Sequence, residues 1–285
     1  MKSLIRQFVE RSEGGAFEKE GGVSEVLGFL LIIAVSFVVF SAFMQTVVPG
    51  IVSSNEAQHY QEVVGQVYSI KSTLMNALSL RLYPNQLYVT LSLGVQTFPV
   101  FIPPSEGQLS VAPFDPNLNF FNVSFTTLAG TQKFSSGLTF YVSLYNHAYP
   151  SQEVIFDNGM IATGQLNSPN LSVISNGTVG IYSSSMTLIL FEDIGNGFSY
   201  TSSGSVGVSI LVTSISSSTY SISSGPVTIT IHSPLSSFWA NYIKSLAPSQ
   251  VQVSQSNGNQ VITVSGINTI TIMLMVLVVS TSGSG

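Results

Sequence analysis

Residues 21–31 read Gly-Gly-Val-Ser-Glu-Val-Leu-Gly-Phe-Leu-Leu, and this stretch is the most informative part of the chain. It leads into an apolar run, Val26 to Met44, that contains no charged residue. As a helix, about 19 residues rise about 28 Å, close to the roughly 30 Å of a bilayer's hydrocarbon core. The apolar region of a secretory signal peptide spans about 7–15 residues and precedes its cleavage site. Here the candidate cleavage site, Gly21-Gly22, precedes the run, so cleavage would leave the helix at the mature N-terminus.

The distribution of basic residues predicts the orientation of this helix. Residues 1–22 contain Lys2, Arg6, Arg11 and Lys19, whereas the next basic residue is Lys71. Lys and Arg near a membrane span stay on the cytoplasmic side. We therefore expect residues 1–22 to be a cytoplasmic leader that is cleaved off, and everything after about Thr46 to lie outside. The alternative is an ordinary single-span anchor that keeps its leader.

The composition describes the part that the helix would hold outside the cell. The chain has no cysteine, so neither disulfides nor a cysteine metal site is available. Charged residues make up 7% of the chain, against about 25% in a typical protein. Because 45% of the residues are hydrophobic, this part is expected to fold, with a surface of Ser, Thr, Asn, Gln and Tyr. Such a surface suits an acidic or hot exterior, and its few basic residues exclude nucleic acid as a partner.

A second helical segment follows the apolar run. Residues 23–48 are predicted to be the transmembrane helix and residues 49–84 an amphipathic helix, with Pro49 kinking or breaking the junction. Between Asn55 and Leu82, apolar residues recur at steps of three and four, which gives one apolar stripe. Its members are Ala57, Tyr60, Val63, Val64, Val67, Ile70, Leu74, Leu78 and Leu82. The polar residues Glu56, Gln58, Glu62, Gln66, Lys71 and Ser72 are expected mostly off this stripe.

From residue 85 onward the hydrophobic period changes to two. Alternating segments rich in β-branched and aromatic residues are separated by Gly, Pro, Asn and Ser. They are 87–93, 120–125, 138–145, 206–212, 227–231 and 261–264. The predicted fold class is therefore α+β: a long N-terminal transmembrane and amphipathic helix packed on a mainly antiparallel, β-sandwich-like extracellular domain, residues 85–285. One such domain is favoured over two with a boundary near residues 195–204.

Two segments interrupt the alternation. Residues 236–246 place Phe238, Trp239 and Tyr242 on one helical face. Trp239 and Tyr242 would then form a ligand platform, or the helix would close one end of the sandwich, and we favour the second interpretation. Residues 267–279 are nearly all apolar and predict a central strand buried on both faces, against which the long helix packs. Residues 280–285 are expected to be a flexible end.

The sequence contains little that indicates chemistry. His59, His147 and His232 lie far apart, and the adjacent acids Glu192-Asp193 precede Ile-Gly-Asn-Gly, which favours a turn over a metal site. Because the chain is rich in serine, a Ser/His/Asp triad is an alternative that the sequence does not exclude, but no Gly-x-Ser-x-Gly elbow marks a nucleophile. The sequence also has no phosphate-binding glycine pattern. We therefore predict a protein that is not an enzyme and uses no cofactor.

Three Asn-x-Ser/Thr sequons fall in the part that is expected outside. They begin at Asn122, Asn170 and Asn176. Glycans there would solvate a surface with few charges, so these residues are candidate glycosylation sites.

The leader, Gly21-Gly22, Val23-Ser24-Glu25-Val26-Leu27-Gly28 and the apolar helix together resemble the class III signal of archaeal type IV pilin-like proteins. The resemblance implies cleavage after a glycine by a prepilin-type peptidase, with Gly21, Gly22 and Val23 as the processing residues. It also implies that the retained helix bundles in the core of a filament whose outer surface is a β-rich head. A charged residue directly before the glycine is usual in the family. Cleavage after Gly21 would put the charged Glu20 directly before the glycine at the cleavage site. Cleavage after Gly22 would put Gly21 in that position.

Assembly would depend on residues of the apolar helix. In bacterial relatives a Glu at the fifth mature position pairs with a neighbour's N-terminal amine, whereas Glu25 would be third or fourth. A carboxylate at the edge of an apolar helix is still costly unless it is paired. Small residues that let helices approach closely are Gly28, Ala34, Ser36, Ser41 and Ala42.

Two functions are compatible with these features. The first is a pilin-like cell-surface subunit that self-assembles into an adhesive or structural filament, with membrane lipid and the peptidase as partners. The second is a single-pass, membrane-anchored ectodomain that binds a sugar, peptide or surface-layer partner without polymerising. A secreted hydrolase is a distant third, because no catalytic constellation supports it. In the first two cases the protein resides at the cell membrane with its C-terminal domain outside.

Overall fold

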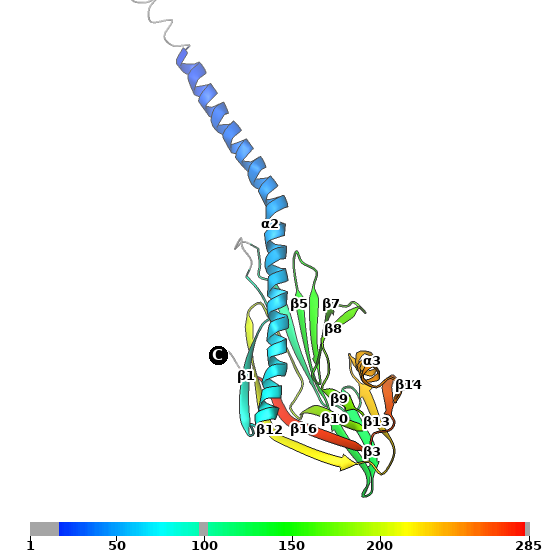
Figure 1. The fold of residues 1–285 in the computed structure, drawn as a ribbon. Helices are drawn as coiled ribbons and strands as arrows, with labels where there is room; N and C mark the ends of the chain where they lie inside the picture. Colours follow the sequence, from blue (N-terminus) through cyan, green and yellow to red (C-terminus); the bar gives the residue numbers. More distant parts are fainter. Residues whose placement is uncertain (1–16, 97–101, 283–285) are drawn as a thin grey trace, which may run out of the picture. The chain divides into compact units, whose positions relative to one another are not determined.

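The computed structural model describes residues 17–96 and 102–282, with side chains from Ser24 to Gln96 and from Ile102 to Thr281 (Figure 1). The chain forms two compact units, residues 1–51 and 52–285. The first contains the N-terminal part of helix α2 (Phe17–Leu80), and the second contains the rest of that helix, the strands and a short helix, α3 (Ser236–Leu246). The strands are β1 (Asn85–Ser92), β2 (Glu106–Pro113), β3 (Phe120–Thr127), β4 (Gly130–Ser136), β5 (Leu138–Tyr145), β6 (Gln152–Asp157), β7 (Met160–Gln165), β8 (Leu171–Ser175), β9 (Val179–Tyr182), β10 (Ser185–Asp193), β11 (Phe198–Ser202), β12 (Ser205–Ser221), β13 (Ser224–His232), β14 (Val251–Ser256), β15 (Asn259–Val264) and β16 (Thr269–Ser282).

Helix α2 continues through Pro49, so of the two predicted outcomes, a kink or a break, the break does not occur. Proline removes one N–H from the helix and leaves the carbonyl four residues earlier without its helical partner. That carbonyl belongs to Gln45, and both Gln45 and Pro49 are exposed. No protein core therefore encloses the unpaired carbonyl, and the helix continues past the proline.

The second half of α2 buries one face, as predicted, but the buried face begins earlier than expected. Val63, Val67, Ile70 and Leu74 are completely buried. Glu56 and His59 are also buried and extend the same face toward the N-terminus, so Glu56 does not lie off the stripe. A hydropathy pattern does not place a carboxylate in a buried face. The burial of a carboxylate is tolerable only when hydrogen bonds satisfy it, and the pattern carries no information on those bonds.

The helix ends at Leu80, four residues before the predicted limit of residue 84, in a Schellman motif. The N–H of Leu82 donates to the carbonyl of Ala77 at 2.9 Å, and that of Arg81 donates to Leu78 at 3.2 Å. Arg81 occupies the left-handed region, with φ 51°, where glycine is usual. Leu82, assigned to the apolar stripe by the pattern, therefore lies beyond the helix and is exposed.

The strands form three sheets, and the prediction of an α+β chain with mainly antiparallel strands is confirmed. The strand orders are β1-β12-β16-β10-β9, β11-β2-β5-β6-β7-β8 and β14-β15-β13-β3-β4. All pairings are antiparallel except that of β10 with β16. All six segments predicted from alternation coincide with strands, and only Leu93, at the end of segment 87–93, lies beyond its strand.

Two core clusters fill the space between these elements. In the first, the buried face of α2 packs with side chains of β1, β12, β16, β2 and β5. The second contains α3 with β3, β13 and β15, together with parts of β9 and β10. The clusters meet at sheet β1-β12-β16-β10-β9, whose long strands β12 and β16 run side by side (Figure 1).

Strand β16 is the central strand of its sheet and is buried on both faces, as predicted. Ile270 and Ile272 point into the second cluster, whereas Met275, Leu277 and Val279 point from the opposite face into the first. The first cluster also contains the buried face of α2, so the helix and this strand belong to the same core, as expected. Residues 280–282, expected in a flexible end, instead belong to the strand: Ser280 pairs with Ser209 of β12. Residues 283–285 lie outside the described residues.

Candidate functional site

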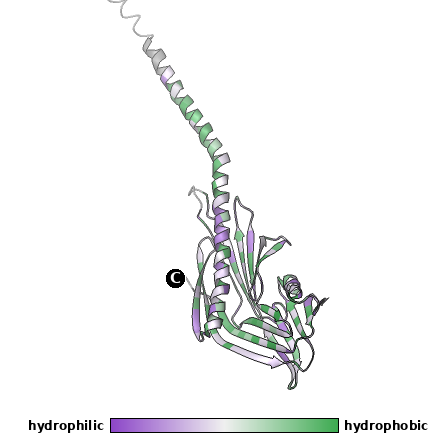
Figure 2. Ribbon diagram, in the orientation of Figure 1, coloured by the Kyte–Doolittle hydropathy of each residue, from purple (hydrophilic) through white to green (hydrophobic). Residues whose placement is uncertain are grey.

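The apolar part of α2 presents hydrophobic side chains on all of its sides. Its apolar side chains from Val26 to Val47 are mostly exposed, for example Phe37 and Val38 at 69% each. An 18-residue window of the helix has a mean hydropathy of 2.8, and α2 is the one helix among the described residues long and apolar enough to cross a membrane. Figure 2 shows this apolar stretch and the more polar residues that follow along the helix. A helix that is hydrophobic all round requires apolar surroundings.

Hydroxyl groups within this stretch are satisfied by the helix itself. The Oγ of Ser36 donates to the carbonyl of Ile32 and the Oγ1 of Thr46 to that of Ala42, each at 2.7 Å. In the absence of water an unpaired hydroxyl is costly, whereas these bonds allow both residues to face lipid or another helix.

The residues assigned to assembly lie on two sides of α2. Successive helical residues are rotated by about 100°, so Gly28 lies about one turn from Glu25 on a similar side, whereas Ala34 lies roughly opposite Glu25. Ser41 is seven residues from Ala34 and shares its side. All four are exposed, and no heavy atom lies within 4 Å of a Cβ built on Gly28. Small residues are therefore available on more than one side of the helix.

The predicted processing residues Gly21, Gly22 and Val23 fall within α2, but their side chains are outside the description. Residues 1–16 of the predicted leader also lie outside the described residues. The helix begins at Phe17 and thus runs through the candidate cleavage site.

A buried carboxylate fastens the second half of α2 to the loop between β5 and β6. The Glu56 carboxylate accepts backbone N–H groups from His147 at 2.7 Å and from Ala148 and Tyr149 at 2.8 Å each. Three successive donors around one carboxylate form an anion-binding nest. The helix supplies the anion, so this nest is occupied by the chain itself.

Three further polar side chains of the helix bind neighbouring loops and strands. The Nε2 of His59 lies 3.0 Å from the carbonyl of Ser92, and burial lowers the pKa of this imidazole. Gln66 accepts the N–H of Ser92 at 2.8 Å. The Lys71 ammonium donates to the Oγ of Ser175 and the carbonyl of Asn176, and burial lowers its pKa. These residues position the helix and do not form a catalytic arrangement.

The three sequons occupy different environments. Asn122 lies in the middle of β3, paired on both sides, and its Oδ1 is buried. Asn170 and Asn176 are exposed and lie in the loops before and after β8. In the sequon of Asn176, however, the hydroxyl of Thr178 donates to the carbonyl of Ile189 at 2.7 Å.

The short helix 236–246 forms as predicted, and it packs on the second core cluster instead of offering a ligand platform. Trp239 is fully buried, with its ring edge-on to Phe121 at 5.1 Å. Its indole N–H donates to the Asp157 carboxylate at 3.2 Å, as does the hydroxyl of Ser233 at 2.6 Å. Burial raises the pKa of Asp157 to about 6, although these donors oppose the shift.

The adjacent acids Glu192 and Asp193 end β10 at a turn, as predicted. The Oδ1 of Asp193 accepts the N–H of Gly195 at 2.9 Å and that of Val279 at 3.2 Å. Burial raises the pKa values of both carboxyls. No group of three or more metal-binding side chains occurs in the described part of the chain. The histidines stay apart: His147 lies near Pro104, and His232 contacts Asn259.

No family model, no curated protein and no solved structure matches this chain. Its function must therefore be argued from its own residues. The sequence analysis did not identify two residues with an important structural role, Glu56 and Asp157. Both are buried carboxylates whose hydrogen-bond donors, from backbone or side chains, are distant in the sequence.

Proposed function

We propose that this chain is a pilin-like cell-surface subunit, whose apolar helix anchors it in the membrane and then joins other copies in a filament core. The β-rich domain would face outward and make adhesive or structural contacts. A prepilin-type peptidase would remove the leader at Gly21-Gly22, and membrane lipid would surround the helix before assembly.

The observation that carries the proposal is the exposed apolar surface around the whole first half of α2, continuous with a helix whose second half is built into a folded domain. A signal peptide is discarded, whereas this helix shares its C-terminal part with the core of the domain. This continuity supports retention of the apolar part with the domain, where lipid or other helices would cover it.

The positions of the small residues favour assembly over a simple anchor. Gly28 lies near the side of Glu25, and Ala34 and Ser41 lie on another. Close packing on two or more sides suits a helix with several neighbours, as in a bundle. An anchor surrounded by lipid has no need of small residues on either side.

The N-terminal sequence and intact mass of the protein purified from its native membranes test this function. A start at Gly22 or Val23 is the expected result, followed by filaments in electron micrographs of sheared surface fractions. The double substitution of Gly21 and Gly22 by Leu should abolish both cleavage and filaments. The matched control replaces the second pair in the same leader, Gly14 and Gly15, by Leu and should be processed normally.

A start at Met1 or at Lys2 would overturn the pilin function. It would leave the non-polymerising, membrane-anchored ectodomain as the better account of the chain.

A further inference from the structure

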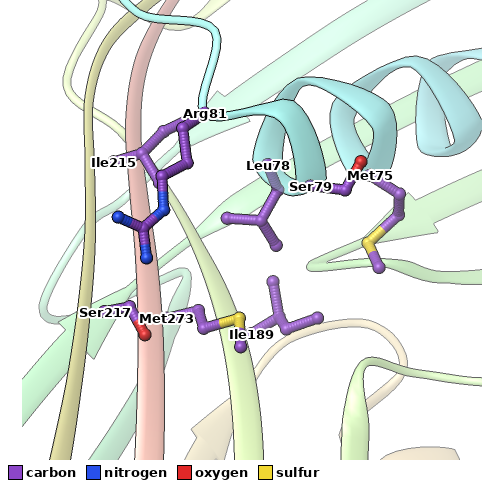
Figure 3. A pocket seen from close by; sticks show the side chains of 8 residues that line it. All are labelled: Met75, Leu78, Ser79, Arg81, Ile189, Ile215, Ser217 and Met273. Carbon is purple, nitrogen blue, oxygen red and sulfur yellow. The ribbon is translucent and has the colours of Figure 1, made fainter.

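A cavity of about 350 Å³ opens where the end of α2 meets the sheet of β10, β12 and β16. Its walls are mainly apolar: Met75 and Leu78 come from the helix, Ile189 from β10, Ile215 from β12 and Met273 from β16, and Ser79 and Ser217 add two hydroxyl groups. Figure 3 shows Leu78, Met75, Ile189 and Met273 pointing toward the same space. A volume of this size, with apolar walls, falls within the range of small-molecule sites.

One charged side chain borders this cavity. Arg81 extends along its side, with the guanidinium near Ser217 (Figure 3). No Asp or Glu is among the described residues that line the cavity. A guanidinium beside apolar walls, without an acid in the lining, is complementary to a ligand with a hydrocarbon tail and an anionic head.

The backbone at Arg81 adds to this argument. Arg81 is the residue after the helix end, where φ is 51° and glycine is least strained. An L-residue in this region costs about 1 kcal/mol or more. The chain carries an arginine at a position where the backbone favours glycine, and the arginine places its charge at the edge of the cavity.

We propose that this cavity binds an amphiphile with a hydrocarbon tail and a single anionic head group, such as an alkyl carboxylate. The tail lies between Leu78, Ile189 and Met273, and the head group pairs with Arg81. The site belongs to the β-rich unit and does not depend on filament formation.

Methionine methyl groups provide a direct test. The full chain, labelled with ¹³C at the methionine methyls, is placed in nanodiscs of zwitterionic lipid and titrated with octanoate. The signals of Met75 and Met273 should shift and saturate. Met160 and Met186, which are buried in the second core cluster, report any loss of folding, and Met44, in the apolar stretch of α2, reports partitioning into the bilayer. Octyltrimethylammonium, with a similar tail and the opposite charge, should saturate the shifts of Met75 and Met273 only at clearly higher concentration than octanoate does.

Two variants at one position separate charge from backbone effects. Arg81→Gly removes the charge and suits the φ of this residue, so it should fold at least as well and bind octanoate about fivefold more weakly. Arg81→Lys keeps the charge and should lose less affinity for octanoate than Arg81→Gly does. Four outcomes would each overturn the proposal. They are equal shifts with the cationic amphiphile, equal shifts at all methionines, the absence of any saturable shift, and an unchanged affinity for octanoate in Arg81→Gly.

Discussion

The carboxylate of Glu56 accepts the backbone N–H of Tyr149 at 2.8 Å, across 93 residues of sequence. Together with the N–H groups of His147 and Ala148, this bond fastens the amphipathic half of α2 to the β5–β6 loop. A charged acceptor in a buried site contributes more than an ordinary hydrogen bond, because its loss leaves several donors unsatisfied.

Glu56→Ala should therefore lower the free energy of unfolding of the β-rich unit by about 2–4 kcal/mol. Denaturant unfolding of the full chain, followed by the fluorescence of Trp239, measures this change. Glu62→Ala removes the same charge from an exposed position of the same helix, where the carboxylate accepts the side-chain amide of Gln66 at 2.9 Å, and should cost about 1 kcal/mol or less. Equal effects of the two substitutions would contradict the assigned role of Glu56.

Gly177 leaves space for the ring of Trp239. A Cβ at this glycine would overlap the six-membered ring of the indole, which is fully buried and cannot move aside easily. Gly177→Ala should destabilise the domain by about 1–3 kcal/mol, the usual cost of overpacking a core. Gly180→Ala is the matched control, since nothing lies within 4 Å of its Cβ position. A thermal melt in which the two variants behave alike would show that the indole relaxes freely.

The buried Asp157 should make the domain more stable in acid. Its pKa is about 6 in the folded state, against 3.8 for an ordinary aspartate, because burial disfavours the charged form. The folded state thus takes up a proton at a higher pH than the unfolded state. The resulting contribution, about 2–4 kcal/mol, is fully present below about pH 4 and is lost as the pH rises through 6.

Unfolding free energies between pH 4 and pH 8, compared for the parent chain and Asp157→Asn, isolate this contribution. The difference between the two profiles should change over the window from about pH 4 to 6. His59 acts in the opposite direction, because its lowered pKa makes the folded state weaker as the pH falls, but it is present in both proteins. Parallel profiles would mean that Asp157 titrates normally.

Elements with a strong period were predictable from the sequence. The stripe of Val63, Val67, Ile70 and Leu74 indicated both the helix and its buried face, and the apolar run 267–279 indicated a doubly buried strand. Two hairpin turns, Asn158-Gly159 and Asn257-Gly258, have positive φ values and connect paired strands. Asn-Gly is a sequence signal for such turns, but the alternation of apolar residues alone did not identify them.

The residues that polar contacts hold in place were not predictable in this way. Glu56 and Asp157 read as solvated charges, because their partners come from segments brought near only by the fold. The parallel pairing of β10 with β16 was equally hidden, since these strands are separated by the whole of β11 to β15. A local pattern cannot report either kind of distant partner.

The accessibility of the three sequons predicts which one carries a glycan in the folded protein. At Asn170 both the acceptor amide and the hydroxyl-bearing Ser172 are exposed, and Ser172 belongs to β8, at the edge of its sheet. At Asn122 the side-chain oxygen is buried within a paired strand, and at Asn176 the hydroxyl of Thr178 is already bonded to Ile189. We expect modification at Asn170 and none at Asn122, because an acceptor must reach solvent.

Glycopeptide mass spectrometry of the native protein measures the occupancy of each site, and Asn170→Gln should remove the glycan without changing the melting temperature by more than about 2 °C. A glycan found on Asn122 would mean that modification precedes folding of the β3 sheet.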